Sequence, residues 1–278
     1  MNKLNLKKLL KKGGLIAPGA FNAASAMLIE KAGFPVVYIS GAGLSNSSGR
    51  PDTGLLTLEE TAVFSSYIIN SVRIPAIVDA DTGFGGPREV KRAVEVFEDI
   101  GAAAIQLEDQ AGDKRCGHLA GKKIVSAKEF VAKIKAAVNA RKSKGFLIIA
   151  RTDAAAVSGL SDAVCRGRAY LEAGADIIFP EALASREEFA AFSRAVDAPL
   201  MANMTEFGKT PYMKADEFFR LGFSLVIFPM TAFRIAMHAA EDALAALHKK
   251  GTQKDMLGKM QTREELYKLL GYKPERKL

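Results

Sequence analysis

The chain has 278 residues, of which 49% are hydrophobic and 25% are charged. These proportions exclude a disordered chain, a collagen and a small disulfide scaffold, and the length allows one large domain or two small ones. Lysine and arginine exceed aspartate and glutamate by 39 to 31, and the resulting net charge of +8 suits a nucleic acid, an anionic membrane or a small polyanionic substrate.

The first segment, residues 1–14, is rich in lysine and lacks the continuous apolar stretch of a signal peptide. It predicts a short amphipathic surface helix that ends at Gly13 and Gly14. No apolar run in the sequence reaches the length of a membrane span, and two cysteines in a chain of this size are typical of a reducing compartment. We therefore expect a cytoplasmic protein with no membrane partner.

Short apolar runs rich in β-branched residues recur along the chain, each bounded by turn residues. The eight predicted strands are Leu15–Ala17, Val36–Ser40, Ala76–Ala80, Ala104–Glu108, Leu147–Thr152, Ile177–Glu181, Leu200–Asn203 and Leu225–Pro229. Between them lie stretches with helical periodicity, such as Leu58–Val72, Arg88–Ile100, Ala127–Arg141 and Asp162–Ala173. This alternation predicts an α/β fold with a parallel sheet, and eight units in this length predict a single (β/α)8 TIM barrel domain over residues 1–278.

Two features depart from a minimal barrel. Long loops are expected at Gly41–Leu56 and Asp109–Val125, and both leave the carboxyl end of a strand, where this fold carries its active site. The last strand is followed by two helical stretches, Met230–His248 and Lys254–Gly271, where one would suffice. We expect a C-terminal helical extension from about 250 to 278.

Asp79 and Asp81 stand at the end of the third predicted strand. On a strand, residues two apart face the same way, so the two carboxylates would point together into the barrel mouth. Unpaired, they would repel one another, and a divalent cation such as Mg²⁺ would remove that cost. The alternative is that they are ordinary turn acids before a glycine-rich turn with Pro87 at the start of a helix.

A thiol lies among basic residues in the loop after the fourth strand, in Lys114-Arg115-Cys116-Gly117-His118. Cations and an imidazole beside Cys116 would lower the pKa of its thiol and make it a usable proton donor or nucleophile. The alternative is an exposed basic loop with an incidental cysteine. Cys165 lies in a helical pattern and is predicted to be a packed structural thiol.

Other strand ends offer groups for binding an anion. Arg151 ends the fifth strand and Arg234 begins the helix after the eighth, and a guanidinium is suited to gripping a carboxylate or phosphate. Ser40-Gly41-Ala42-Gly43 closes the second strand with small residues that would let backbone N–H groups approach an anion, unless it is simply the start of a flexible loop. Tyr38 shares the face of Ser40, where core packing is the simpler role.

Taken together, these residues resemble the methylisocitrate lyases of the isocitrate lyase / phosphoenolpyruvate mutase superfamily. The similarity runs from about Leu15 to Tyr272 and rests on several motifs: Tyr38-Ile39-Ser40-Gly41, Val78-Asp79-Ala80-Asp81-Thr82-Gly83, Glu108-Asp109-Gln110, Lys114-Arg115-Cys116-Gly117-His118, Phe179-Pro180-Glu181-Ala182, Ala202-Asn203-Met204-Thr205 and Met260-Gln261-Thr262-Arg263. The thiol-bearing loop is typical of the lyase branch. The chain departs from many members at Ala42, where they have glycine.

The resemblance implies cleavage of 2-methylisocitrate to pyruvate and succinate with Mg²⁺, which Mn²⁺ could replace, in the methylcitrate cycle of propionate catabolism. It implies that Asp79 and Asp81 hold the metal with Glu108 close by, and that Cys116 reprotonates the succinate carbanion. Asp52 and Tyr38 are both candidates for deprotonating the hydroxyl. The implied substrate-binding residues are Ser40, Gly41, Ala42, Cys116, Gly117, His118, Arg151, Glu181, Asn203, Met204, Thr205, Arg234 and Arg263.

The resemblance also implies an eighth helix exchanged with a neighbouring subunit, in a homotetramer. The close alternatives are a related lyase acting on 2,3-dimethylmalate or isocitrate, and an oxaloacetate decarboxylase. A nucleic-acid-binding protein is a different class, but the lysines are dispersed and no nucleic-acid-binding motif is evident. A barrel that binds small di- or tricarboxylates without turnover is disfavoured by Asp79, Asp81 and Cys116.

Overall fold

The structure is a computed structural model that describes residues 5–112, 114–115, 117 and 121–272. Eight parallel strands form a barrel, in the order β6-β5-β4-β3-β2-β1-β8-β7. An isolated parallel bridge between Ile178 and Leu200 joins the two ends of this sheet. The strands are β1 (Leu15–Ala20), β2 (Val37–Ile39), β3 (Ala76–Asp79), β4 (Ala104–Glu108), β5 (Leu147–Thr152), β6 (Ile177–Pro180), β7 (Met201–Asn203) and β8 (Leu225–Phe228).

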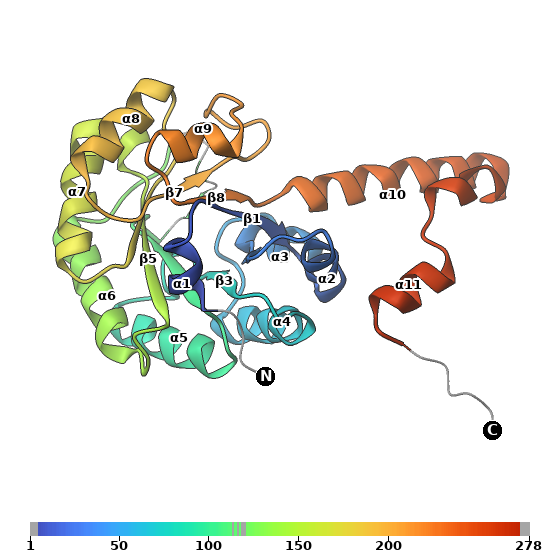
Figure 1. The fold of residues 1–278 in the computed structure, drawn as a ribbon, viewed down its shortest axis with the longest axis horizontal. Helices are drawn as coiled ribbons and strands as arrows, with labels where there is room; N and C mark the ends of the chain where they lie inside the picture. The colour runs from blue at the N-terminus through green and yellow to red at the C-terminus, as the bar shows by residue number, and fades with distance from the viewer. Residues whose placement is uncertain (1–4, 113, 116, 118–120, 273–278) are drawn as a thin grey trace.

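The predicted barrel is therefore confirmed, and β4 and β5 have the predicted bounds. Helices cover the outside of the strands, as Figure 1 shows. They are α2 (Ala23–Lys31), α4 (Leu58–Ser71), α5 (Pro87–Asp99), α6 (Ala127–Ala140), α7 (Leu160–Glu172), α8 (Arg186–Ala195) and α9 (Ala215–Arg220), with a short 3₁₀ turn η1 (Ala154–Ala156) before α7. The four helices predicted by periodicity agree with α4 to α7 within two residues at each end.

The strands have two different faces, which set apart two layers of core. In β4, Ile105 and Leu107 belong to the outer apolar layer beneath the helices, whereas Ala104 belongs to the inner layer. Since successive side chains alternate along a strand, Gln106 and Glu108 face the barrel interior with Ala104. β4 thus delivers two polar side chains to the barrel interior, Gln106 from its middle and Glu108 from its carboxyl end.

The N-terminal helix α1 (Leu6–Leu10) is amphipathic as predicted, but it does not simply lie on the surface. Leu6 is buried, with 1% of its surface exposed, and packs in the inner core layer with Leu15 and Leu225. Figure 1 shows α1 over the middle of the ring of strands. The helix closes the amino-terminal end of the barrel, so the opposite end is the open one.

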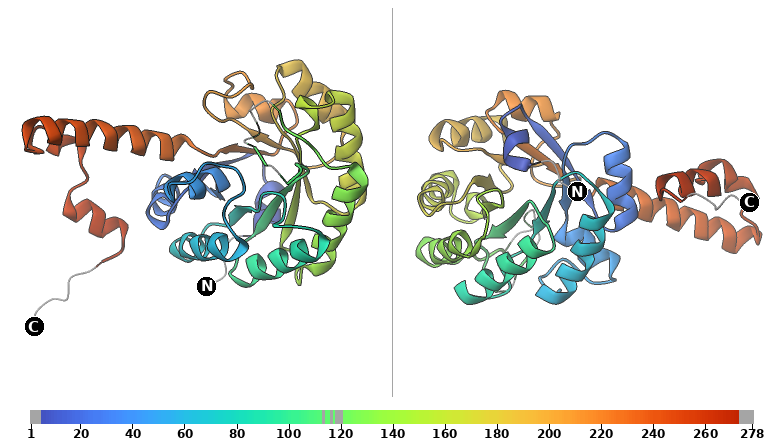
Figure 2. Two further views of the ribbon diagram at one scale, coloured as in Figure 1. Left: turned by 180° about the vertical axis from the view of Figure 1, so that it is seen from behind. Right: turned by 60° about the horizontal axis from the view of Figure 1, so that its bottom comes forward.

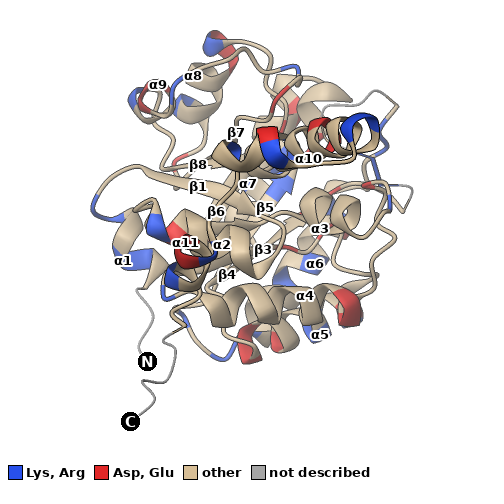
Figure 3. Ribbon diagram, turned by 90° about the vertical axis from the view of Figure 1, so that its right-hand side faces the viewer, with Lys and Arg blue, Asp and Glu red and all other residues tan. Residues whose placement is uncertain are grey.

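The helix after β8 leaves the barrel. α10 (Thr231–Lys250) has no buried residue and extends away from the strands, and η2 (Lys254–Lys259) and α11 (Arg263–Leu269) follow it. Figure 2 shows this arm projecting from the barrel in both of its views. C-terminal helices are therefore present among the described residues, and the arm begins with the eighth helix itself. Lysine, arginine and acidic residues are interspersed on the face seen in Figure 3.

Two predictions of local structure are wrong. The predicted loop Gly41–Leu56 begins with a helix, α3 (Gly41–Ser47), because the Ser40 side chain caps it by accepting a hydrogen bond from the Gly43 N–H. Cys165, predicted to be packed, is exposed on α7. The described residues contain no helix that is both long enough and apolar enough to cross a membrane.

Among the residues that the structure describes, four other than glycine have left-handed backbones: Asp81, Phe84, Ala182 and Phe207, with φ between 49° and 61°. Asp81 and Phe84 follow β3, Ala182 follows β6 and Phe207 follows β7. All four therefore lie beyond the carboxyl ends of strands, at the open end of the barrel.

Candidate active site

A cavity of about 400 Å³ lies at the open end of the barrel. Strand ends, the start of α3 and the start of α10 contribute its walls. The predicted site residues that line it are Tyr38, Ser40, Ala42, Asp52, Asp79, Gly117, Arg151, Glu181, Asn203, Thr205 and Arg234. The structure thus gathers most of the predicted residues around one space, from segments far apart in the sequence.

Three carboxylates form an acidic group beside this cavity. Asp79, Asp81 and Glu108 each offer an oxygen within 4.8 Å of the others. The expected reason for the Asp79–Asp81 pairing is wrong, because β3 ends at Asp79 and Asp81 lies in a left-handed turn with φ 49°. The turn is held by the Asp81 N–H, which donates to Asp79 Oδ1 at 3.2 Å, and by the Glu108 N–H, which donates to the Asp81 carbonyl at 2.9 Å.

The acidic group has the properties of a cation site. Glu108 is fully buried, and neither carboxylate oxygen accepts a hydrogen bond among the described residues, although Oε2 forms an ion pair with the Arg151 guanidinium at 3.2 Å. Burial raises the pKa of Glu108 well above its ordinary value, although Arg151 and Lys114 oppose this rise. Burial also raises the pKa of Asp81 to about 6, against the opposing effect of Lys114. Oxygen-only ligands of this kind suit a hard divalent cation, which would stabilise the ionised carboxylates.

Lys114 is a site residue that the sequence does not predict, because its only visible role there is that of a cation near Cys116. Its side chain is 5% exposed, and Nζ forms ion pairs with Asp52 at 2.7 Å and with Asp81. Burial alone would lower the pKa of Lys114, but Asp81, Glu108 and Asp52 raise it well above its ordinary value. The ammonium group is therefore charged and connects the acidic group to Asp52, at the cavity wall.

Arg151 lies between three carboxylates. Its Nε donates to Asp153 Oδ2 at 2.9 Å, and its guanidinium is 3.2 Å from Glu108 and 3.7 Å from Glu181. Burial alone would lower the pKa of Arg151, but Asp153, Glu108 and Glu181 raise it well above its ordinary value. The side chain is permanently charged and lines the cavity, as a carboxylate-binding group must.

The two candidate bases differ in their surroundings. The Tyr38 hydroxyl donates to Gln106 Oε1 at 2.6 Å, and burial and the charge of Asp79 raise its pKa well above the ordinary value. A phenol in this state is a poor base. Asp52 lines the cavity and is 16% exposed, with Lys114 on one oxygen.

Some predicted residues are not brought to the cavity wall by their side chains. Met204 packs into the outer core layer, and its sulfur accepts a hydrogen bond from the Met213 N–H. Gly41 acts through its backbone, since its N–H donates to Asp79 Oδ2 at 3.2 Å. Arg263 begins α11 and does not line the cavity. Cys116 and His118 lie outside the described residues.

Other polar side chains of the cavity wall also contact charged or aromatic neighbours. Asn203 Nδ2 donates to Glu181 Oε1 at 3.2 Å, and Arg234 at the mouth is 3.5 Å from Glu206 with its guanidinium over the ring of Phe207. The cavity can thus bind a small polyanion next to a cation site, and the Asp52 carboxylate lies on the same cavity wall.

The chain resembles proteins of known activity over almost its whole length. The family described as phosphoenolpyruvate phosphomutase matches residues 6–248. A 2-methylisocitrate lyase from Aeropyrum pernix is 54% identical over 97% of this chain and 87% of that protein. The crystal structure of a 2,3-dimethylmalate lyase has a TM-score of 0.91 at 38% identity and covers 96% of this chain and 90% of its own. The structure of a phosphonopyruvate hydrolase with oxalate and Mg²⁺ has a TM-score of 0.87 at 32% identity and covers 96% and 94%.

Proposed function

Because the chain belongs to the phosphoenolpyruvate phosphomutase family, we propose that it is a carbon–carbon lyase that cleaves 2-methylisocitrate to pyruvate and succinate. The observation that carries this proposal is its identity to a named 2-methylisocitrate lyase, which is higher than its identity to the 2,3-dimethylmalate lyase. The substrate is thus a small tricarboxylate, and the enzyme works in propionate breakdown through the methylcitrate cycle. We place it in the cytoplasm, where its two thiols stay reduced.

Mg²⁺ is the proposed cofactor, with Mn²⁺ as a substitute. The hydrolase relative binds Mg²⁺ with oxalate, and here Asp79, Asp81 and Glu108 supply only oxygen ligands, as this cation prefers. When bound, Mg²⁺ would polarise the oxygens of the oxo-acid part of the substrate. Arg151 would bind a carboxylate there with Ser40, Gly41 and Ala42, which surround Asp79 from the start of α3.

The other predicted binding residues would line the rest of the site. These residues are Gly117, Glu181, Asn203, Thr205 and Arg234 on the cavity wall, His118 from the thiol-bearing loop, Met204 behind the wall, and Arg263. Among the described residues, two cations line the cavity near the acidic group, Lys114 and Arg151, and Arg234 lines it from the first turn of α10. This separation suits a substrate with carboxylates at both ends.

Cleavage needs a base for the hydroxyl and an acid for the carbanion. We propose Asp52 as the base, since Tyr38 is held as a hydrogen-bond donor with a raised pKa. Removal of the hydroxyl proton forms the carbonyl of pyruvate, the carbon–carbon bond breaks, and its electron pair passes to the succinate carbon. Cys116 then donates the proton that this carbon takes up.

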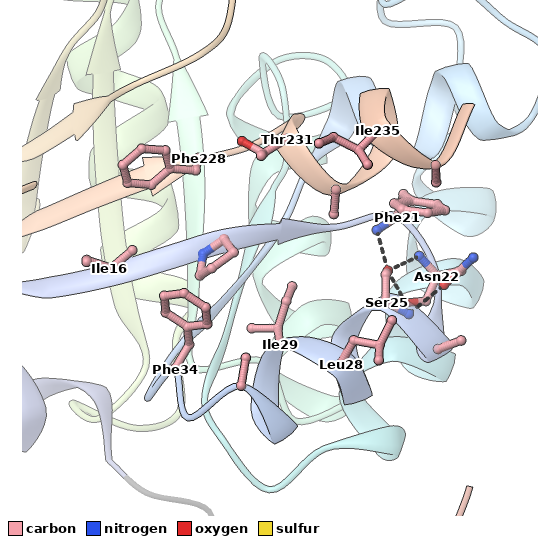
Figure 4. Close-up of a pocket in the computed structure, with 15 residues that line it drawn as sticks. Ile16, Phe21, Asn22, Ser25, Leu28, Ile29, Phe34, Phe228, Thr231 and Ile235 are labelled. Carbon is pink, nitrogen blue, oxygen red and sulfur yellow. Dashed lines mark hydrogen bonds between the residues drawn. The ribbon is translucent and has the colours of Figure 1, made fainter. Parts of the chain in front are cut away.

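The barrel surface that an eighth helix would normally cover is left open, and this supports assembly with a second copy. An apolar groove of about 720 Å³ lies between β1, β8, α2 and the first turns of α10, and its lining includes Ile16, Leu28, Phe34, Phe228 and Ile235 (Figure 4). In this fold a helix normally covers each strand. Outside this groove, α10 exposes Met237, Leu244 and Leu247.

We propose that α10 and α11 of a second copy cover this groove, in a homotetramer. The exposed apolar residues of α10 match the apolar lining of the groove, and reciprocal exchange closes the assembly. The exchange would also place Arg263 away from the cavity of its own chain, which is consistent with its position on α11 outside that cavity.

Product analysis tests the activity. The purified chain, incubated with Mg²⁺ and a panel of 2-methylisocitrate, isocitrate, 2,3-dimethylmalate and oxaloacetate, should release pyruvate and succinate fastest from the first. Excess EDTA should abolish turnover, and Mg²⁺ or Mn²⁺ should restore it. Preferred turnover of another acid would identify one of the related activities, and full activity in EDTA would exclude the metal.

A further inference from the structure

A buried lysine stands behind the cavity wall, outside the residues assigned to the reaction. The Lys122 side chain is 1% exposed, and its Nζ donates to Asp153 Oδ1 at 2.5 Å and to the backbone carbonyl of Gly117. Lysine is almost never fully buried unless it is paired. Its neighbour Lys123, with the same charge in the same segment, is exposed.

The first partner of Lys122 is the carboxylate that orients Arg151. Asp153 is fully buried and accepts from Arg151 Nε at 2.9 Å and from Arg151 Nη2 at 3.1 Å. Asp153 Oδ1 therefore accepts hydrogen bonds from both Lys122 Nζ and Arg151 Nη2. The backbone N–H of Asp153 donates to Asp109 at 2.9 Å, so the carboxylate is fixed from its own main chain as well.

The second partner is the backbone of Gly117, which lines the cavity. A Cβ at this position would lie 2.1 Å from Glu181 Oε1 and 2.4 Å from Arg151 Nη2, so the main chain there lies directly against both side chains. Lys122 therefore ties the Gly117 segment to the same carboxylate that holds Arg151.

The charge of Lys122 matters as well as its hydrogen bonds. Arg151 carries one positive charge and faces three carboxyl groups, those of Glu108, Asp153 and Glu181. Lys122 balances one of these carboxylates. The positive charge of the Arg151 guanidinium is then not fully neutralised by its neighbours, and it can attract an anion that enters the cavity.

We propose that Lys122 is a positioning residue that, through Asp153 and the Gly117 carbonyl, holds Arg151 and the Gly117 backbone in place to bind the carboxylate of an oxo-acid. The proposal deepens the proposed function and rests on it for the identity of the substrate. It assigns Lys122 no contact with the substrate.

The test compares Lys122→Met with Lys122→Arg and with the matched control Lys123→Met. Removing a residue that orients a ligand-binding group through a hydrogen bond typically costs about 10–100-fold in affinity or activity. We expect Lys122→Met to lower kcat/KM by about this factor and to weaken binding of oxalate, measured by calorimetry in Mg²⁺, by about tenfold. Lys122→Arg should recover most of both quantities, and Lys123→Met should match the wild type.

A second readout follows the Gly117 segment without turnover. In a Cys165→Ser background, the rate at which iodoacetamide alkylates Cys116 should change with Lys122→Met and not with Lys123→Met. If Lys122→Met does not fold, Lys122→Gln, which keeps a donor and removes the charge, takes its place. Failure of both neutral variants to fold would show a purely structural role and overturn the proposal.

The outcomes separate this proposal from the proposed function. A wild-type protein without lyase activity would refute the function, while oxalate binding would still report on Lys122. An active wild type, with Lys122→Met equal to Lys123→Met in kcat, KM and oxalate affinity, would refute the role of Lys122 alone.

Discussion

At the scale of single residues, the site depends on charges whose partners lie far apart in the sequence. Asp79 and Asp81 could be predicted as a pair because both lie at the end of one strand, although the left-handed turn at Asp81, and not the alternation along a strand, brings them together. Lys114 could not, since its partner Asp52 is 62 residues away and a lysine in a basic loop gives no sign of its ion pairs. Cys165 was misjudged because a short helix pattern does not fix which face a small side chain takes.

Asp52 and Tyr38 can be separated as bases by two substitutions. Asp52→Asn should lower kcat by about 10²–10⁴-fold, the usual contribution of a general base. Tyr38→Phe removes only a hydroxyl that donates to Gln106, so kcat should fall far less. Steady-state kinetics with 2-methylisocitrate measure both. A larger loss for Tyr38→Phe than for Asp52→Asn would reverse the assignment.

The acidic group predicts an opposite response to pH with and without metal. Without metal, the folded protein holds a proton on Asp81 up to about pH 6, whereas the ordinary pKa is 3.8. Between these values the folded state binds more protons, so the free energy of unfolding should fall as pH rises. Glu108, with its raised pKa, acts in the same direction.

Metal binding needs the ionised carboxylates, so the affinity for Mg²⁺ should fall as pH falls below about 6. Melting curves at about pH 5 and about pH 7.5, with and without Mg²⁺, measure both effects. Mg²⁺ should raise Tm more at the higher pH. An equal rise at both values would contradict a site made of these carboxylates.

At the scale of elements, the strands were readily predicted because apolar β-branched runs buried on both faces leave a strong signal. α3 was not, since Gly41, Ala42 and Gly43 have the composition of a loop. Its cap by Ser40 and the burial of Leu44, which depend on the tertiary structure, make it a helix. α1 was predicted as a helix, but its place beneath the barrel could not be read from its own pattern.

The closing role of α1 gives a prediction about stability. Leu6→Ala should lower the free energy of unfolding by about 2–5 kcal/mol, because it leaves a cavity in the inner core. Since α1 lies at the end opposite the cavity, kcat at 25 °C should stay near that of the wild type. Lys7→Ala, on the exposed side of the same helix, is the control and should change the free energy by no more than about 0.5 kcal/mol. Equal stability of the two variants in urea would show that α1 does not close the core.

At the scale of the whole molecule, helical periodicity indicates a surplus of C-terminal helices, and only the family resemblance implies that the eighth helix leaves its own barrel. Helical periodicity describes an apolar face without naming the surface that covers it. The structure shows that α10 departs and that the groove beside α2 remains.

The groove predicts the outcome of a change in its lining. Light scattering of the wild type should give about four chains per particle, and Leu28→Asp should shift the protein to smaller species by placing a charge in the apolar groove. Leu55→Asp alters another exposed leucine outside this groove and should leave the assembly intact. A wild type that is monomeric at micromolar concentration would refute the exchange.

The four left-handed residues at the open end have a consequence for engineering. Each such backbone costs roughly 1–2 kcal/mol for a residue with a Cβ. Phe207, one of them, is the ring beneath Arg234, and Asp81, another, belongs to the acidic group. Replacing them with glycine or asparagine would lower the conformational strain of the backbone. It would also remove the side chains that these turns hold at the open end. Thermostable variants that keep their turnover should therefore be sought at the α1 end of the barrel, where stability and chemistry do not compete for the same residues.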